Sequence, residues 1–305
     1  RMGDGAGGFI GTSNIYSGAG PTDVVVGDFN TDGNQDIATS NYSSNNIGIL
    51  LGNGLGNFAP ATFVAVQSQP SAIEIGDFNN DGYPDLATAN AGASSVSIRL
   101  GNGLGGFTGS TELSVGISPL SVAVGDFNAD GNQDIACVNY TNSNLSVALG
   151  NGTGTFAAAS SIFVGSYPTS VTVADLNGDG NQDLIGGLGG SYNCYVRLGS
   201  GTGGFNFSSN ISGGYDQTST AIGDFNHDSI LDFVGTMNAG NTAVVRLGIA
   251  SDITLVGNAV AILDGDASPS FADSTDFSTS NISVSTSHTF TIRNAGNDVL
   301  NVPSN

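Results

Sequence analysis

Residues 28–36 read Asp-Phe-Asn-Thr-Asp-Gly-Asn-Gln-Asp, which places side-chain oxygens at the first, third, fifth and ninth positions. Hard divalent cations bind roughly six to eight oxygens, and calcium loops of the EF-hand kind alternate Asp and Asn side chains with a backbone carbonyl around a turn glycine. The stretch therefore predicts a calcium loop. Asp36 closes it three residues earlier than the Glu of an EF-hand, so no exiting helix is implied.

The same stretch occurs five times, and each copy begins 49 residues after the start of the previous one. Asp, Asn and Gly also form ordinary turns, so five polar hairpin turns without an ion are the alternative. Fifteen carboxylates in five short loops would repel one another without a cation, and we therefore predict about five Ca²⁺ ions, one per loop. The candidate ligands are Asp28, Asn30, Asp32, Asn34, Asp36, Asp77, Asn79, Asp81, Tyr83, Asp85, Asp126, Asn128, Asp130, Asn132, Asp134, Asp175, Asn177, Asp179, Asn181, Asp183, Asp224, Asn226, Asp228, Ile230 and Asp232.

The charge balance limits the partners. The 305 residues include 26 acidic residues, five Arg and no Lys, and the formal net charge is −21. A phosphate backbone or an anionic membrane surface attracts clustered Lys and Arg, so we expect no nucleic acid partner and no direct membrane insertion. Fifteen of the acidic residues lie in the five loops, so most of the acidity is predicted to serve as metal ligand.

The predicted calcium loops also suggest where the protein works. Weak calcium modules fill only at millimolar calcium, which favours an extracellular or cell-surface location. The sequence has no signal peptide or long apolar span, and it opens with Arg1-Met2, so we expect a further segment upstream. Cys137 and Cys194 lie in apolar runs at different repeat phases; buried free thiols are the favoured interpretation, and a single disulfide is the alternative.

Within one repeat, short alternating segments predict strands and no segment has a sustained helical period. In the second repeat these segments are 71–76, 86–90, 96–100 and a fourth strand from Phe107, after a Gly-rich turn. Four short strands per 49 residues make one blade of an all-β propeller. Each blade needs a neighbour to bury its apolar positions, which are Phe29, Phe78, Phe127, Leu176, Phe225, Phe9, Phe58, Phe107, Phe156 and Phe205.

The repeat divides the chain into a propeller region, 1–248, and a second all-β region, 249–305. Residues 1–9 align with 99–107, so the chain starts inside the third strand of a blade. The fifth repeat lacks the Gly-rich turn and the fourth strand. Residues 9–16 either supply that strand and close a five-bladed ring or end an upstream blade of a larger ring. The C-terminal region is too short for a complete sandwich of roughly 100 residues.

The loop, the Gly-Asn-Gly-x-Gly-x-Phe turn at 52–58 and the 49-residue period resemble the FG-GAP/VCBS repeats of integrin-like β-propellers. The resemblance covers 1–248. It implies calcium loops between the first two strands of each blade, a ring that is typically seven-bladed, and roles in adhesion and ligand binding. The fifth loop departs from the pattern, because Ser229 replaces the turn glycine, and we expect weaker binding there. The segment 264–296 resembles the start of an immunoglobulin-like choice-of-anchor domain, which implies a bacterial secreted or surface protein.

Two other patterns, one of glycines and one of arginines, say less about function. The glycines at 101, 103 and 106 fit a dinucleotide fingerprint on paper, but a strand follows them where a helix is required, so we reject a cofactor site. Four Arg share one repeat phase: Arg1, Arg99, Arg197 and Arg246. They either bond strand-end carbonyls or neighbouring carboxylates, or they form a partial positive ring for an acidic ligand or another subunit.

Taken together, the sequence predicts a non-enzymatic extracellular calcium-binding β-propeller that acts as an adhesion or ligand-binding scaffold for a protein or glycan. His227 and His288 have no repeated acid or base neighbour, and no nucleophile motif occurs, so we predict no catalytic residues. One alternative is a subunit of an extracellular filament assembled by strand addition. The other is an accessory domain of a secreted carbohydrate-active enzyme.

Overall fold

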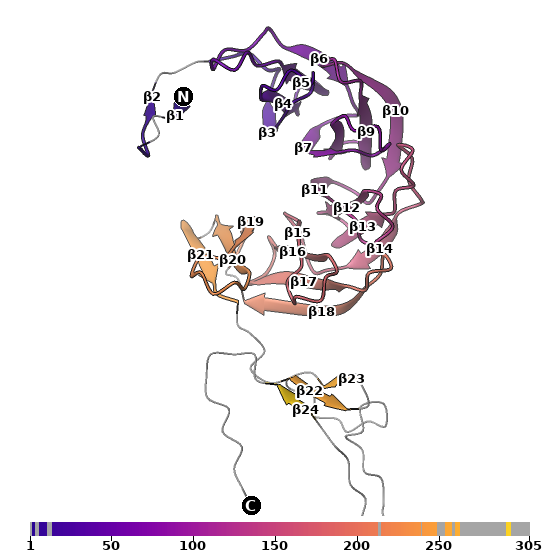
Figure 1. Cartoon of the computed structure of the whole chain (residues 1–305), viewed down its shortest axis with the longest axis vertical. Coiled ribbons are helices and arrows are strands. Elements are labelled where there is room, and N and C mark those ends of the chain that lie inside the picture. Colours follow the sequence, from indigo (N-terminus) through magenta and orange to yellow (C-terminus); the bar gives the residue numbers. More distant parts are fainter. Residues whose placement is uncertain are drawn as a thin grey trace, which may run out of the picture. The chain divides into compact units, whose positions relative to one another are not determined.

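A computed structural model describes residues 2–3, 6–10, 14–212, 215–238, 240–248, 254–257, 260–262 and 291–293, and every regular element in these ranges is a β-strand. Four antiparallel four-stranded sheets follow one another along the chain, each within one repeat, as predicted for propeller blades (Figure 1). Their strands are β3 (Pro21–Gly27), β4 (Asp36–Asn41), β5 (Asn46–Leu50), β6 (Thr62–Ala65), β7 (Pro70–Gly76), β8 (Asp85–Asn90), β9 (Ser95–Gly101), β10 (Phe107–Ser114), β11 (Pro119–Gly125), β12 (Asp134–Asn139), β13 (Asn144–Ala148), β14 (Ser160–Phe163), β15 (Thr172–Ala174), β16 (Asp183–Gly187), β17 (Asn193–Gly199) and β18 (Phe205–Ser212).

Three smaller sheets complete the described structure. The fifth blade has three strands, β19 (Gln217–Gly223), β20 (Asp232–Met237) and β21 (Thr242–Arg246), in agreement with the missing fourth segment of its repeat. The short strands β1 (Met2–Gly3) and β2 (Phe9–Ile10) pair antiparallel, with Gly3 opposite Phe9 in the register of Gly101 and Phe107. A separate sheet contains β22 (Thr254–Gly257), β23 (Val260–Ile262) and β24 (Thr291–Arg293).

The chain divides into two compact units. The blades belong to the first, Arg1–Gly223 and Leu231–Arg246; the second comprises Asp224–Ile230 and Leu247–Asn305. Most of the residues predicted to begin an immunoglobulin-like domain, including His288, lie outside the described residues. That domain therefore stays a prediction. The described residues contain no helix, and none therefore spans a membrane as a long apolar helix.

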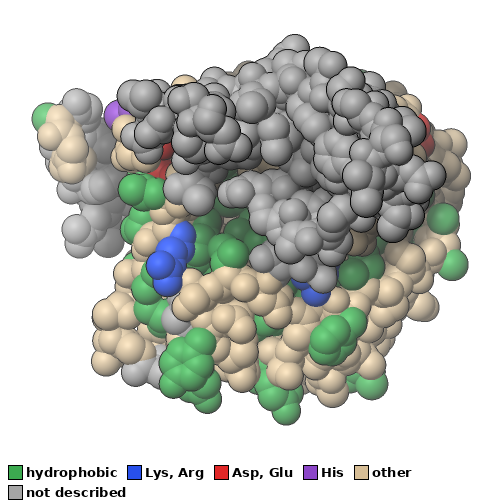
Figure 2. Space-filling model, turned by 90° about the horizontal axis from the view of Figure 1, so that it is seen from below, with side chains coloured by type: hydrophobic (Ala, Val, Ile, Leu, Met, Phe, Trp, Pro, Cys, Tyr) green, Lys and Arg blue, Asp and Glu red, His purple; other side chains and the backbone are tan. Residues whose placement is uncertain are grey.

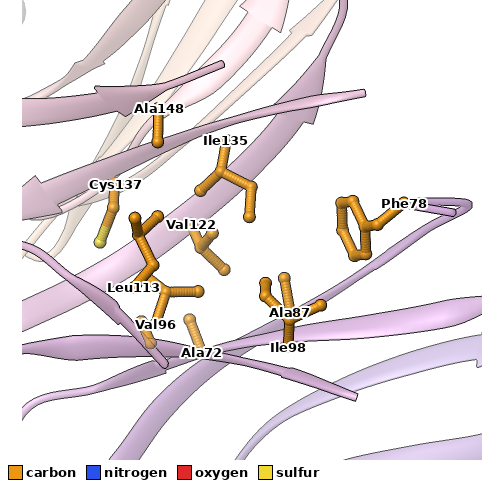
Figure 3. Close-up of a cluster of buried hydrophobic side chains, with 11 residues drawn as sticks. Ala72, Phe78, Ala87, Val96, Ile98, Leu113, Val122, Ile135, Cys137 and Ala148 are labelled. Atoms are coloured by element: carbon orange, nitrogen blue, oxygen red, sulfur yellow. The ribbon is translucent and has the colours of Figure 1, made fainter. Parts of the chain in front are cut away.

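The hydrophobic core lies between blades rather than inside them. Between the second and third blades, Phe78, Val96 and Ile98 of one blade face Val122 and Ile135 of the next, and all five are at most 3% exposed (Figure 3). Equivalent clusters fill the other boundaries from the first blade to the fifth. A single blade would leave one of these faces in water. Stacking buries Phe29, Phe78 and Phe127, as expected, whereas Phe225 is 50% exposed, so the expectation is wrong for the fifth repeat.

The first strands of successive blades also bond directly to one another. A hydroxyl near the start of β3, β7 and β15 donates to the carbonyl at the start of the next blade's first strand. The three bonds are Thr22 to Pro70 (3.0 Å), Ser71 to Pro119 (2.8 Å) and Thr169 to Gln217 (2.9 Å). They hold neighbouring blades in register at the edge where β3, β7, β11, β15 and β19 lie side by side (Figure 1).

Both cysteines are buried free thiols, which confirms the favoured interpretation of the sequence. Burial raises the pKa of the Cys194 thiol to about 11, and its Sγ donates to Oε1 of Gln217 at 2.9 Å. Exposed hydrophobic side chains, in contrast, are scattered. On the face shown in Figure 2 they stand as separate groups among polar atoms.

The boundary core predicts the effect of a truncation. Phe78→Ala should lower the free energy of unfolding by about 3–5 kcal/mol, because it removes a buried ring and leaves a cavity between two blades. The control is Leu104→Ala, since Leu104 is 80% exposed and should change stability by no more than about 0.5 kcal/mol. Chemical denaturation at fixed calcium concentration measures both. Equal losses for the two variants would contradict a core located at the boundary.

Candidate metal centres

Each predicted calcium loop connects the first and second strands of its blade. The loop at 77–85 runs from the end of β7 into the first residue of β8, and the other four loops occupy the same place in their blades. This confirms the position that the sequence implied. The first four loops lie at the strand ends that also carry the Gly-rich turns, and we call this end of the blades the loop side.

Within the second loop, the side chains of positions one, three and five turn toward one another. The backbone N–H of Asp81 donates both to Oδ1 of Asp77 and to Oδ1 of Asn79, each at 3.1 Å. The second oxygen of Asp77 accepts from the N–H of Gly82 at 2.9 Å, and Oδ2 of Asp81 accepts from Nδ2 of Asn79 at 2.8 Å. Three oxygen-bearing side chains are therefore gathered around one turn of backbone.

Position seven enters the loop through its backbone. The N–H of Tyr83 donates to Oδ1 of Asp81 at 2.9 Å, while the tyrosine ring is exposed. This explains why position seven tolerates Asn34, Tyr83 and Ile230 alike. A metal at the loop would use the carbonyl of this residue rather than its side chain.

The other loops repeat this arrangement, so the structure brings together positions one, three and five in every copy. The N–H of position five bonds to oxygens of positions one and three, and the N–H of position seven bonds to an oxygen of position five. These residues are Asp28, Asn30, Asp32 and Asn34; Asp126, Asn128, Asp130 and Asn132; Asp175, Asn177, Asp179 and Asn181; and Asp224, Asn226, Asp228 and Ile230.

The ninth position has a different role in the first four loops. Asp85 is fully buried, and its two oxygens accept from the N–H of Phe78 at 2.8 Å and of Gly101 at 2.7 Å. It thereby fastens the loop to the Gly-rich turn. Only glycine fits at position 101, because a Cβ there would collide with the carbonyl oxygen of Pro84. Asp36, Asp134 and Asp183 make the same pair of bonds; Asp232 is also buried.

Burial raises the pKa of the Asp85 carboxyl to about 6, although the N–H groups of Gly101 and Phe78 act in the opposite direction. The charges of Asp81 and Asp77 raise it further, so the three carboxylates of one loop are close enough to repel. The pKa values of Asp134 and Asp183 are raised by the same causes. A divalent cation in the loop would offset both the burial and the repulsion.

The donor set fits a hard cation in chemistry and charge. Each carboxylate oxygen that accepts one N–H retains a lone pair, and the gathered oxygens are those that calcium prefers. Within the described part of the chain, no group of three or more His, Cys, Asp or Glu side chains is arranged to hold a metal on its own. A cation at 77–85 would therefore need the amide oxygen of Asn79 and the carbonyl of Tyr83 beside the carboxylates.

In the fifth loop, Ser229 occupies the place of the turn glycine. Its N–H still donates to Oδ2 of Asp224 at 2.9 Å, and its backbone adopts φ of 68°. A serine in this left-handed conformation costs free energy that Gly33 or Gly82 does not. The weaker site expected here stays a prediction, with a physical cause in the backbone.

Three loops also join their blade to the next one. The phenylalanine at loop position two packs edge-on against the phenylalanine after the next blade's Gly-rich turn, and its carbonyl accepts an N–H of that turn. The ring pairs are Phe29–Phe107 (5.6 Å), Phe78–Phe156 (5.6 Å) and Phe127–Phe205 (5.5 Å), and the donors are Gly105 (2.9 Å), Gly154 (2.8 Å) and Gly203 (2.8 Å).

The Arg residues of shared phase bond the preceding blade. Arg99 donates to the carbonyl of Ala65 at 2.9 Å and forms an ion pair with Glu112 at 2.7 Å. Arg197 donates to Phe163 at 2.8 Å, and Arg246 to Ser212 at 2.9 Å. Arg99 and Arg197 are buried, so the structure supports the carbonyl-bonding interpretation for these three rather than a positive ring. Arg1 lies outside the described residues.

Two features of the loop side were not anticipated from the sequence. The residue at position four has a left-handed backbone in every loop, although four of the five copies use Thr31, Asn80, Ala129 and His227 rather than glycine. In the third loop, Oε1 of Gln133 at position eight accepts the N–H of Asp77 in the preceding blade, at 2.6 Å. The recurrence of Gln at position eight in three loops was the available signal.

Comparison with known proteins agrees with this architecture. The chain matches the FG-GAP-like repeat over residues 29–88, 77–137, 126–186 and 175–235. None of the curated proteins matches it.

Solved structures with similar folds come from diverse organisms. A lectin of Agrocybe aegerita that recognises non-reducing terminal N-acetylglucosamine has a TM-score of 0.50, 20% identity and coverage of 77% of this chain and 70% of its own. A protein of unknown function from Desulfotomaculum acetoxidans has a TM-score of 0.56 and 12% identity, and the match covers 74% of this chain and 68% of its own. A candidate 6-phosphogluconolactonase of Bacteroides fragilis has a TM-score of 0.58 and 14% identity, and the match covers 75% of this chain and 66% of its own. At these identities the likeness concerns the fold.

The buried ninth-position carboxylate generates a testable prediction. In the presence of a chelator, Asp85→Ala should lower the free energy of unfolding by about 2–4 kcal/mol, because it leaves two buried N–H groups without an acceptor. Asp81→Ala should cost much less under the same conditions, since Asp81 is exposed. Urea denaturation compares the two. An Asp85→Ala loss no larger than that of Asp81→Ala would show that the fastening bonds do not stabilise the fold.

Proposed function

This chain belongs to the family of FG-GAP-like repeat proteins, and we propose that it is a calcium-stabilised β-propeller scaffold that binds a protein or glycan ligand outside the cell. The observation that carries the proposal is the gathering of three oxygen-bearing side chains in each of five loops that connect the first and second strands of a blade. One calcium ion per loop accounts for all five copies.

Calcium is proposed as a structural component. The ligands would be the side-chain oxygens of positions one, three and five and the carbonyl of position seven, with the ninth-position carboxylate contributing charge from behind the loop. Because the same loops bond to the next blade through Phe29, Phe78 and Phe127, an ion that orders a loop would also stabilise a blade boundary. Loops of this open, acidic kind fill at millimolar calcium, which supports a secreted or cell-surface location.

Binding is a better explanation of the repeats than catalysis. A catalytic carboxylate pair would account for one loop, whereas ligation accounts for five, and the buried Asp residues are engaged with backbone N–H groups. One of the proteins of similar fold is a lectin and another a candidate lactonase. A glycan is therefore one ligand class worth testing, and the fold by itself does not decide between binding and catalysis.

Calcium dependence tests the proposal. Adding millimolar calcium to protein freed of calcium by a chelator should raise the midpoint of thermal unfolding. Each filled loop should add about 2.7 kcal/mol to the free energy of unfolding when calcium is about 100-fold above its Kd. Asp81→Asn should remove the stabilisation that calcium provides at one loop, because it removes the charge of one ligand. Asp23→Asn is the matched control, because Asp23 lies in β3, outside the loops, and accepts the N–H of Ile73 as an Asn oxygen also can.

Differential scanning calorimetry measures the three proteins with calcium, with magnesium and with chelator. A midpoint that ignores calcium and chelator alike would contradict the proposed function. So would an Asp81→Asn variant that responds to calcium as strongly as the parent.

A further inference from the structure

The end of the blades opposite the loop side carries a set of exposed tyrosines. We call it the hairpin side; it consists of the turns between second and third strands and the crossovers that lead into each first strand. Five of the eight tyrosines of the chain lie there. Their exposed fractions range from 36% to 66%, and they are Tyr42, Tyr140, Tyr167, Tyr192 and Tyr215.

Between the turns of the first and second blades the hairpin side has an open hollow of about 520 Å³. Its lining combines a tyrosine ring with amide and hydroxyl groups and contains no charged side chain. The crossover forms its floor, where the N–H of Gln69 donates to Oδ1 of Asn45 at 2.9 Å. The lining residues are Tyr42, Ser43, Asn45, Ser68, Gln69 and Gly92.

At two other boundaries, tyrosines occupy the repeat positions of these lining residues. Tyr140 and Tyr167 stand where Tyr42 and Gln69 stand, and their ring centroids are 5.0 Å apart with planes inclined by 36°. Tyr192 and Tyr215 stand where Asn45 and Ser68 stand, with centroids 4.9 Å apart and planes inclined by 43°. Each pair offers a broad, partly exposed aromatic surface beside polar groups.

The architecture does not need these tyrosines. The crossover residue has a left-handed backbone at each boundary, with φ of 65° at Gly20 in the first blade and 57° at Tyr167 in the fourth. A bulky side chain is disfavoured in that conformation. The boundary between the second and third blades has Ala91 and Ser118 at the two positions and is built in the same way. A tyrosine therefore occupies position 167 although the left-handed backbone there disfavours a bulky side chain. This favours a role for the Tyr167 ring at the surface.

The chemistry of these surfaces selects a class of ligand. An exposed aromatic ring stacks on the flat C–H face of a pyranose, and neighbouring amides and hydroxyls both donate and accept hydrogen bonds, as sugar hydroxyls require. Asp216, which follows Tyr215 in the chain, accepts a hydrogen bond from Nδ2 of Asn238 at 3.2 Å, and the chain carries a net charge of −21. Both features disfavour an acidic ligand.

We propose that the blade boundaries of the hairpin side are binding sites for neutral pyranose sugars, centred on the Tyr140–Tyr167 and Tyr192–Tyr215 pairs and on the hollow beside Tyr42. This proposal rests on the proposed scaffold function and names its ligand class and its sites. The sites are separate and recur from blade to blade, so they suit a glycan with many identical ends, for which several weak contacts add up to firm attachment. A proline-rich peptide would instead need one continuous aromatic groove.

The experiment uses the full chain in millimolar calcium and a panel of methyl glycosides of glucose, galactose, mannose and N-acetylglucosamine, with sialic acid as the charged comparison. Because the chain has no Trp, its intrinsic fluorescence reports on tyrosine. At least one neutral glycoside should change that fluorescence saturably and show saturation-transfer signals in NMR, and sialic acid should not.

Variants locate the sites. Replacing Tyr140, Tyr167, Tyr192 and Tyr215 together by Ala should weaken binding at least tenfold, because both tyrosine pairs are lost and the remaining hollow is lined by one tyrosine ring, that of Tyr42. Tyr16→Ala, which removes a 71% exposed tyrosine outside the hollows, should leave binding unchanged. In the variant that lacks these four tyrosines, Gln69→Tyr should restore binding, because the new ring would pair with Tyr42. Ser118→Tyr should not, because Ala91 stands opposite.

Thermal midpoints with calcium and chelator accompany every measurement, so that loss of fold is distinguished from loss of a site. If calcium stabilises the protein and no neutral glycoside binds, the proposed sugar sites are wrong while the scaffold proposal stands. The same conclusion follows if the variant that lacks the four tyrosines binds sugar as the parent does. Binding to a proline-rich peptide alone would overturn the sugar sites in the same way. Loss of calcium dependence would overturn the scaffold itself.

Discussion

The fold depends on a buried carboxylate that is shared between two segments of each blade. At the ninth loop position of the first four blades, one oxygen of the Asp accepts the N–H of loop position two, and the other accepts the N–H of the glycine that begins the Gly-rich turn. Burial of a charge is costly, and here the cost is offset by two charge-assisted hydrogen bonds. The requirement fixes the loop, the turn and the glycine together, which explains why they recur as one unit.

That constraint separates the two ends of the blades chemically. On the loop side, carboxylates are concentrated and the phenylalanines at position two of the first three loops join those loops to the next blade, so electrostatics and blade stacking are coupled. On the hairpin side, the crossover repeats its backbone conformation but not its side chains. Sequence freedom is therefore greatest where Tyr167, Gln69, Ser118 and Asp216 occupy one repeat position, and that is where a repeat protein can acquire specificity.

The sequence predicted the blade, its strands and the place of the loops, because strand alternation, turn glycines and apolar phases are local signals that five copies reinforce. It also placed Asp77, Asn79 and Asp81 together. It did not reveal that Asp85 turns to the backbone, since a ligand and a hydrogen-bond acceptor are the same residue in a pattern. Contacts between blades, such as Arg99 with Ala65 or Tyr140 with Tyr167, depend on how repeats stack, and spacing along one chain does not encode that.

Amide hydrogen exchange tests the buried carboxylate most directly. The N–H groups of Phe78 and Gly101 lie at the ends of a loop and a turn, where exchange is ordinarily fast, but their bonds to Asp85 predict exchange as slow as that of Ala87 within β8. Measured by NMR on the intact chain, protection equal to that of Ala87, lost at both amides in Asp85→Ala, is the expected result. Exchange of both amides at the rate of exposed turn residues would contradict the account.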